Sequence, residues 1–171
     1  IPDVPSIGVK AAGSGGDDAE PEPVVVNDLN LQNGLVELSL DPVGRVTHLA
    51  CSGASRSVNS PSDPLGQLML YEDRPRRWEA WDIDSDYVET GRPIESPAEI
   101  EMVEHHPLRC VIEFRRALGE RSRLVQRYVL KAGSPRVDVE YLVDWQEDQM
   151  LLRLSCPTAV RARAGTVGIQ F

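Results

Sequence analysis

Residues 136–145 read Arg-Val-Asp-Val-Glu-Tyr-Leu-Val-Asp-Trp, in which apolar and charged side chains alternate with Leu142 as the one exception. Side chains of a β-strand point to its two faces in turn, so this period of two predicts a half-buried strand. The tripeptide Gly133-Ser134-Pro135 provides a turn before it. The residues expected on the apolar face are Val137, Val139, Tyr141 and Val143.

Strand patterns recur along the rest of the sequence. They lie at residues 24–31, 35–40, 45–51, 65–71, 99–104, 108–117, 122–131 and 150–156. Turn signals separate them, among them Asn33-Gly34 and residues 41–44, Asp-Pro-Val-Gly. No helix longer than about three turns is indicated. The sequence therefore predicts an all-β fold, a sandwich of antiparallel strands.

The first residues differ in composition from the rest. Residues 10–23 are rich in Gly, Pro and acidic residues and lack an apolar face. We therefore expect an extended first segment and flexible linker at residues 1–23, followed by the β-sandwich domain at residues 24–171. The chain begins without Met and ends on residues 165–171, which resemble a strand. We expect an excised piece of a longer polypeptide.

Charge and cysteine content limit the partners and the compartment. The net charge of −9 opposes binding to nucleic acid and to anionic membranes, and no apolar run approaches the length of a membrane-spanning helix. Cys51, Cys110 and Cys156 lie far apart without Cys-x-x-Cys spacing, which argues against a disulfide framework or a zinc site. We interpret them as buried, inert thiols. A reducing, cytoplasmic compartment fits this interpretation.

Residues 71–84 read Tyr-Glu-Asp-Arg-Pro-Arg-Arg-Trp-Glu-Ala-Trp-Asp-Ile-Asp and fit neither period. They predict a long ordered loop, which continues to Pro97. Trp is highly buried on average, so from residue types alone we favour a Trp pair that caps the core. The alternative is a rim that presents aromatic faces and carboxylates to a sugar. Under the first interpretation, the charges that hold the loop together pair Arg74, Arg76 and Arg77 with Glu72, Asp73 and Glu79.

This loop resembles the signature that opens the C-terminal β-sandwich region of α-mannosidases of glycoside hydrolase family 38. Residues 31–36 and 41–46 resemble the first hairpin of that region, and residues 132–138 and 143–145 resemble its later strands. The match covers nearly the whole chain. The resemblance implies a large two-sheet sandwich of the type shared with galactose mutarotases.

Family α-mannosidases are retaining and zinc-dependent, and the resemblance implies that their nucleophilic Asp and zinc ligands lie in an N-terminal catalytic domain. That domain is not part of this sequence, so we expect neither a catalytic residue nor a metal ligand here, and we expect the fragment to be inactive alone. Its expected partners are the missing catalytic domain and an α-mannoside substrate. The residues expected to bind substrate at the rim of the sugar pocket are Arg74, Trp78, Trp81, Asp82 and Asp84.

Two other functions stay open from the sequence. A free-standing carbohydrate-binding module would use the tryptophan loop without help from another domain. An aldose epimerase-like enzyme would need a catalytic His, and His105-His106 at an expected hairpin tip does not provide one facing a concavity. Adjacent strand residues point to opposite faces, so this pair is also poorly arranged for one metal ion. Homo-oligomerisation stays open as well.

Overall fold

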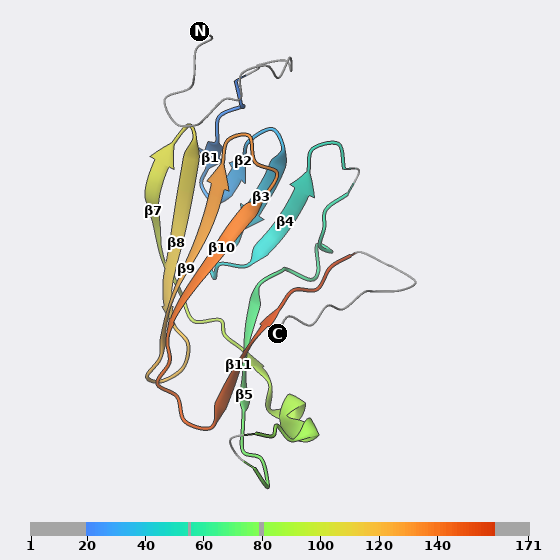
Figure 1. The fold of residues 1–171 in the computed structure, drawn as a ribbon, viewed down its shortest axis with the longest axis vertical. Helices are drawn as coiled ribbons and strands as arrows, with labels where there is room; N and C mark the ends of the chain where they lie inside the picture. The colour runs from blue at the N-terminus through green and yellow to red at the C-terminus, as the bar shows by residue number, and fades with distance from the viewer. Residues whose placement is uncertain (1–19, 55, 79–80, 160–171) are drawn as a thin grey trace, which may run out of the picture.

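The computed structural model describes residues 20–54, 56–78 and 81–159, which fold almost entirely into strands (Figure 1). This confirms the all-β prediction. The strands are β1 (Val25–Asn27), β2 (Asn30–Gln32), β3 (Val36–Leu40), β4 (Val46–Cys51), β5 (Gln67–Glu72), β6 (Arg92–Pro93), β7 (Glu99–His106), β8 (Arg109–Ala117), β9 (Arg123–Lys131), β10 (Val137–Asp144) and β11 (Met150–Ser155). The described part of the chain also contains a 3-10 helix, η1 (Ser85–Thr90).

The strands form three antiparallel sheets. Sheet A has the order β1-β2-β3-β4, sheet B the order β11-β5-β6, and sheet C the order β10-β9-β8-β7. The register of β10 agrees with the alternation seen in the sequence. Val137 lies opposite Leu130 and Tyr141 lies opposite Gln126, so the apolar side chains of β10 share the face of sheet C that carries Leu130. Sheet C is the largest layer, and sheets A and B cover different ends of it (Figure 1).

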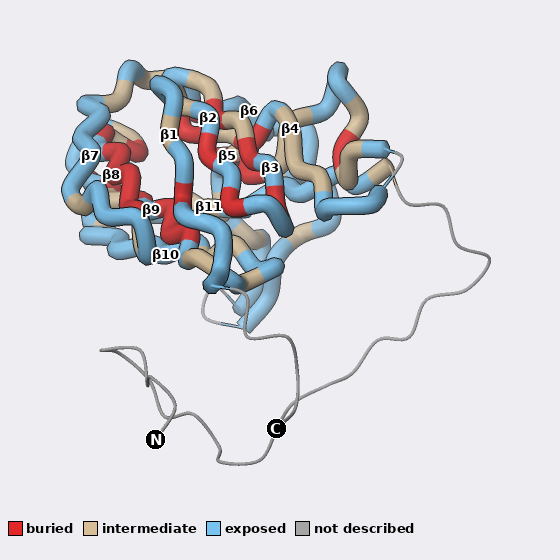
Figure 2. The backbone as a smooth tube through the Cα atoms, turned by 90° about the horizontal axis from the view of Figure 1, so that it is seen from above, coloured by how far each residue is buried: buried red, intermediate tan, exposed pale blue. Residues whose placement is uncertain are grey.

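Two apolar cores lie on the same face of sheet C. The first joins sheet A to one end of sheet C and includes Leu38 of β3 with Phe114 of β8 and Tyr128 of β9. The second joins sheet B to the other end and includes Leu70 of β5 with Leu124 of β9. Figure 2 shows the buried stretches of β2 and β3 on one side and those of β8 and β9 on the other. The sandwich is therefore built from one long sheet and two shorter ones.

A polar seam separates the two cores. Arg116 on β8 and Gln126 on β9 belong to the face of sheet C that carries both cores, and both are buried. The segment that precedes β5 joins sheet A to sheet B. In it Leu65 exchanges main-chain hydrogen bonds of 2.8 and 2.9 Å with Val46 of β4. The positive φ of Gly44 (75°) lets its carbonyl reach the seam. That carbonyl accepts hydrogen bonds from Gln126 Nε2 at 3.0 Å and from the Tyr128 hydroxyl at 2.8 Å.

Two local predictions were wrong. The segment after residue 84 is not a continuous loop, because η1 and β6 form there, and β6 pairs with β5. The thiol prediction holds for Cys110 alone, since Cys51 and Cys156 are exposed at the ends of β4 and β11. Cys51 is the last residue of β4 and Cys156 directly follows β11, and both strands are at the edges of their sheets.

The predictions for residues 1–19 and for the final strand at 165–171 fall outside the described residues. At the first described positions, Val24 is buried, and its N–H donates to the carbonyl of Pro107 at 2.7 Å. Within the described ranges, no helix has the length and apolar content needed to cross a membrane.

Candidate functional site

The loop that follows β5 is held by one arginine and two aspartates. The Arg76 side chain forms ion pairs with Asp84, at 3.3 Å from Nε to Oδ2, and with Asp86. The main-chain N–H of Arg76 also donates to Asp84 Oδ2 at 3.0 Å. These contacts join the outgoing arm of the loop to the start of η1. Loop-stabilising ion pairs with Glu72, Asp73 and Glu79 were predicted, but Arg76 pairs with Asp84 and Asp86, and Glu79 lies outside the described residues.

The two tryptophans of the loop lie on the surface. Trp78 is 71% exposed, and Trp81 is 89% exposed. The carbonyl of Trp78 accepts hydrogen bonds from the N–H groups of Trp81 at 2.7 Å and Asp82 at 2.9 Å, which forms a tight turn. The prediction that the pair caps the core is therefore wrong. The aromatic surface is available to another molecule or domain.

Trp78 also has an unusual backbone conformation. Its φ is +61°, a left-handed conformation that bulky side chains rarely adopt because the Cβ atom crowds the following carbonyl. The hydrogen bonds of the turn hold this conformation. Strain of this kind at an exposed position is a reason to look for a function.

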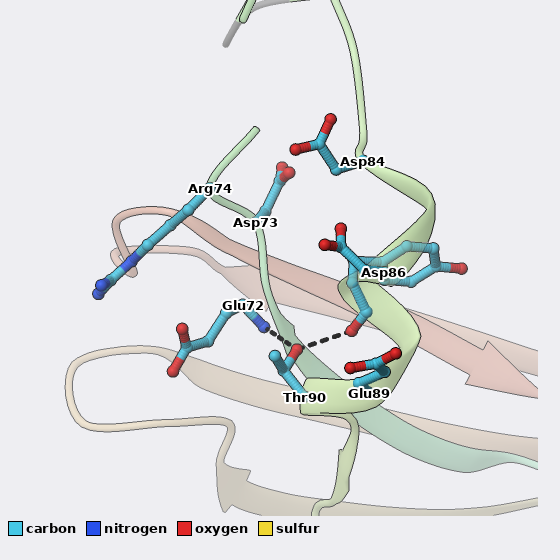
Figure 3. A pocket seen from close by; sticks show the side chains of 8 residues that line it. Glu72, Asp73, Arg74, Asp84, Asp86, Glu89 and Thr90 are labelled. Carbon is cyan, nitrogen blue, oxygen red and sulfur yellow. Dashed lines mark hydrogen bonds between the residues drawn. The ribbon is translucent and has the colours of Figure 1, made fainter. Parts of the chain in front are cut away.

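A shallow hollow of about 230 Å³ lies beside the loop, between its outgoing arm and η1 (Figure 3). Its lining residues are Glu72, Asp73, Arg74, Asp84, Asp86, Tyr87, Glu89 and Thr90. The carboxylates of Asp73 and Asp84 lie near the same end of the hollow, whereas the Arg74 side chain extends away from them (Figure 3). Asp73 Oδ1 is buried and has no hydrogen-bond partner within the described residues. The hollow therefore offers acceptors to a ligand rich in hydroxyl groups.

Thr90 and a pair of tyrosine rings hold the elements that line the hollow. The Thr90 hydroxyl donates to the Tyr87 carbonyl at 2.7 Å and accepts the N–H of Glu72 at 2.9 Å (Figure 3). The rings of Tyr71 and Tyr87 meet edge to face at 5.1 Å between centroids. The Arg153 guanidinium lies 5.9 Å and 5.6 Å from these two ring centroids. β5, η1 and β11 are thus tied together under the loop.

The structure separates the five predicted site residues into two groups. Arg74 and Asp84 line the hollow. Trp78, Trp81 and Asp82 lie at the exposed turn, where Asp82 Oδ1 accepts the N–H of Ile83 at 3.0 Å. The sequence analysis missed the remaining hollow residues on η1, of which Tyr87 and Thr90 fix its shape. Their signal was weak, because a helix of six residues leaves little periodicity to detect.

The histidine pair gives no second site. His105 and His106 are the last residues of β7 and pair with Cys110 and Arg109. His106 Nδ1 accepts the N–H of Leu108 at 3.1 Å, which shapes the hairpin turn. Among the residues with described positions, no three His, Cys, Asp or Glu side chains converge so that they could hold a metal ion.

Comparison with known proteins gives a consistent result. Alpha-mannosidase 2C1 of Homo sapiens is 32% identical over 144 residues, which is 84% of this chain and 14% of that protein. The Mus musculus protein of the same name is 31% identical over 144 residues. Alpha-mannosidase G of Dictyostelium discoideum is 30% identical over 149 residues. The chain thus spans about 14% of the length of these relatives.

A sequence model of one family matches residues 31–171, which include every strand from β3 onward and the whole tryptophan loop. Its description is "Glycosyl hydrolases family 38 C-terminal domain". The match agrees with the all-β architecture and covers most of the chain. This protein belongs to the family of glycosyl hydrolase family 38 C-terminal domains.

Proposed function

We propose that this chain is the non-catalytic β-sandwich domain of a retaining α-mannosidase that hydrolyses terminal α-mannosides. It packs on the catalytic domain of the same polypeptide and forms one side of the sugar pocket. The observation that carries this proposal is the exposure of Trp78 and Trp81 on a loop that is otherwise held in place by ion pairs. Large aromatic side chains kept at the surface of an ordered loop are typical of contact sites.

The residue types at the loop suit a sugar. An indole ring stacks on the apolar face of a pyranose, which gives Trp78 and Trp81 their role. Carboxylates accept hydrogen bonds from paired hydroxyl groups, and we assign this role to Asp82 and Asp84. Arg74 donates to ring or hydroxyl oxygens. The acidic hollow continues the same surface and favours a neutral, hydroxyl-rich ligand over an anion.

The bond-breaking chemistry belongs to another part of the polypeptide under this proposal. A retaining glycosidase needs two carboxylates that flank the scissile bond, one as acid and one as nucleophile. We assign these groups and the zinc ion to the catalytic domain, as the resemblance to family 38 α-mannosidases implies. The great length of the relatives leaves ample sequence for such a domain. The exposed thiols of Cys51 and Cys156 support a reducing, cytoplasmic location, which cell fractionation tests.

The decisive experiment compares variants of the complete enzyme on an aryl α-mannoside. Trp81→Ala and Asp82→Asn should each lower kcat/KM by about tenfold or more, which corresponds to about 1.4 kcal/mol of lost transition-state stabilisation. Arg136→Gln, at an exposed position just before β10, is the surface control. Unchanged kinetics in both loop variants, with normal folding, would show that the loop does not contact substrate.

A free-standing carbohydrate-binding module is the second candidate, and the same exposed tryptophans favour it. The two functions differ in what the isolated chain does. A binding module should bind mannose-containing glycans alone, with quenching of tryptophan fluorescence in a titration. A domain that only completes a pocket should show no binding until the catalytic domain is present. The isolated chain should hydrolyse no mannoside in either case.

A further inference from the structure

The seam between the two cores contains a buried cation. Arg116 is 5% exposed and lies on β8, between Phe114 of the first core and Leu118 of the second. Its Nη2 group donates a long hydrogen bond of 3.3 Å to Gln126 Oε1. Its Nε and Nη1 atoms are buried and have no partner within the described residues. Nothing in the proposed sugar contact uses this side chain.

The acceptors near Arg116 are already occupied. The Tyr128 hydroxyl donates to the Gly44 carbonyl at 2.8 Å and accepts from Gln126 Nε2 at 2.8 Å. Asp41 favours the charged guanidinium electrostatically, but its Oδ2 lies 2.6 Å from Arg45 Nε. Asp41 Oδ1 accepts the N–H groups of the turn at Val43 and Arg45. These groups maintain the seam, and among the described residues no carboxylate forms an ion pair with Arg116.

An unpaired buried guanidinium is strongly unfavourable. Burial lowers the pKa of Arg116 from its usual range, since removal from water penalises the charged form. A buried charge is normally retained only where it is paired and hydrogen-bonded. Tyr141, whose phenol interacts electrostatically with Arg116, is 37% exposed on β10. The Tyr141 hydroxyl lies 3.4 Å from Gln126 Nε2, so a partly exposed side chain adjoins the seam on the side of β10.

We propose that Arg116 is a binding site for a carboxylate, which an Asp or Glu side chain from outside the described residues supplies in the complete polypeptide. A carboxylate has the charge and the two acceptor oxygens that the free Nε and Nη1 groups need. The segment that carries it lies against the inner face of β10, where Val139 and Val143 are 40% and 39% exposed. These side chains supply the apolar part of the contact. The long remainder of the relatives gives room for such a segment.

The first test uses sodium formate as a free carboxylate and thermal unfolding of the 171-residue chain. Acids of this chain outside the described residues are neutralised first, so that none can occupy the site. They are Asp3, Asp17, Asp18, Glu79 and the C-terminal carboxylate of Phe171, which is amidated. In this background formate should raise Tm by about 2–4 °C over sodium chloride of equal ionic strength. Arg116→Met should abolish the difference, and the exposed control Arg136→Met should keep it. Equal Tm in formate and chloride would overturn the site.

A second readout avoids dependence on the folding of Arg116→Met. The Nε–H signal of Arg116 in a nitrogen-edited NMR spectrum should shift on addition of formate and stay unchanged in chloride. No shift in the folded chain would contradict the proposal. These two measurements do not depend on the proposed function.

The source of the carboxylate is tested in the complete enzyme, a step that rests on the proposed function. If a segment fills the site, Arg116→Met should lower Tm there, and formate should have no effect on the unsubstituted enzyme. Stabilisation of the complete enzyme by formate would overturn the segment and assign the site to a free carboxylate. If the tryptophan loop does not contact sugar, the expected effect of formate on the 171-residue chain stays the same.

Discussion

The side-chain amide of Asn33 donates a hydrogen bond of 2.7 Å to the main-chain carbonyl of Lys131. It also donates to the Ser134 carbonyl at 2.8 Å, while its Oδ1 accepts the N–H groups of Leu35 and Val36. Asn33 is only 1% exposed. One side chain thus fixes the turn between β2 and β3 and ties sheet A to the turn at the end of sheet C.

Asn33→Ala should destabilise the fold far more than a turn substitution normally does. The change removes four hydrogen bonds, one of them buried and three partly buried, so the free energy of unfolding should fall by about 2–4 kcal/mol. Urea unfolding followed by circular dichroism measures this. Asn30→Ala is the control, since Asn30 is exposed and donates one hydrogen bond to Asn27. Equal losses in the two variants would contradict a special role for Asn33.

Gly44→Ala should lower the free energy of unfolding through both backbone strain and steric crowding, and Gly53→Ala measures the backbone strain alone. Both glycines have positive φ, 75° and 78°. An added Cβ at Gly44 would lie 3.1 Å from Gln126 Oε1 and 3.2 Å from the Phe114 ring, whereas Gly53 has no atom within 4 Å. Gly53→Ala should cost about 1–2 kcal/mol from backbone strain alone, and Gly44→Ala about 1–3 kcal/mol more. Equal losses in urea unfolding would mean that the seam adapts to the new methyl group.

Local periodicity predicted the strands well because the face on which each strand side chain lies depends only on its position along the strand. The alternation at residues 136–145 placed Val137, Val139, Tyr141 and Val143 on one face, and the pairing of β10 with β9 confirms it. Their exposure, however, depends on whether a second layer lies over them. Sheet A does not extend over the outer part of β10, so Val139 is 40% exposed although its residue type predicts burial.

The candidate site could be predicted only in part. The sequence identified the loop and its charges, but the partner of Arg76 depends on how the chain folds back, which no local pattern encodes. From residue types alone the tryptophans were expected to cap the core because Trp is buried on average, yet both are exposed. The seam was not predicted either. Arg116 and Gln126 lie at core-facing strand positions that usually carry apolar side chains, and no local pattern shows that two polar residues meet there.

The three cysteines should differ sharply in reactivity. Cys51 and Cys156 are exposed and should react quickly with a thiol reagent in the native protein. Cys110 is 0% exposed, and burial raises the pKa of its thiol, so it should react only on unfolding. The number of thiols modified before and after addition of urea measures this. Fast reaction of Cys110 in buffer would show that the first core opens.

Glu147 should make the protein sensitive to acid. Its Oε1 accepts the N–H groups of Arg121 at 2.8 Å and Ser122 at 2.9 Å, and these bonds lower the pKa of the carboxyl group below its ordinary value of 4.5. Stability from this group is complete above that ordinary value and is lost as pH falls through the lowered pKa. Glu147→Gln should lower Tm at neutral pH and show a smaller further fall in acid. Glu120→Gln, at an exposed neighbouring position, is the control for the loss of one carboxylate.

The tryptophan loop should contribute little to the stability of the isolated chain. Trp81→Ala should change the free energy of unfolding by less than about 0.5 kcal/mol, because Trp81 is 89% exposed. Leu70→Ala, a buried position on the preceding strand, should cost about 2–5 kcal/mol. Trp78→Asn should raise stability by about 0.5–1 kcal/mol, since Asn tolerates the positive φ better. A loss above about 1 kcal/mol in Trp81→Ala would mean that the indole supports the fold, which would remove the reason to assign it to substrate contact.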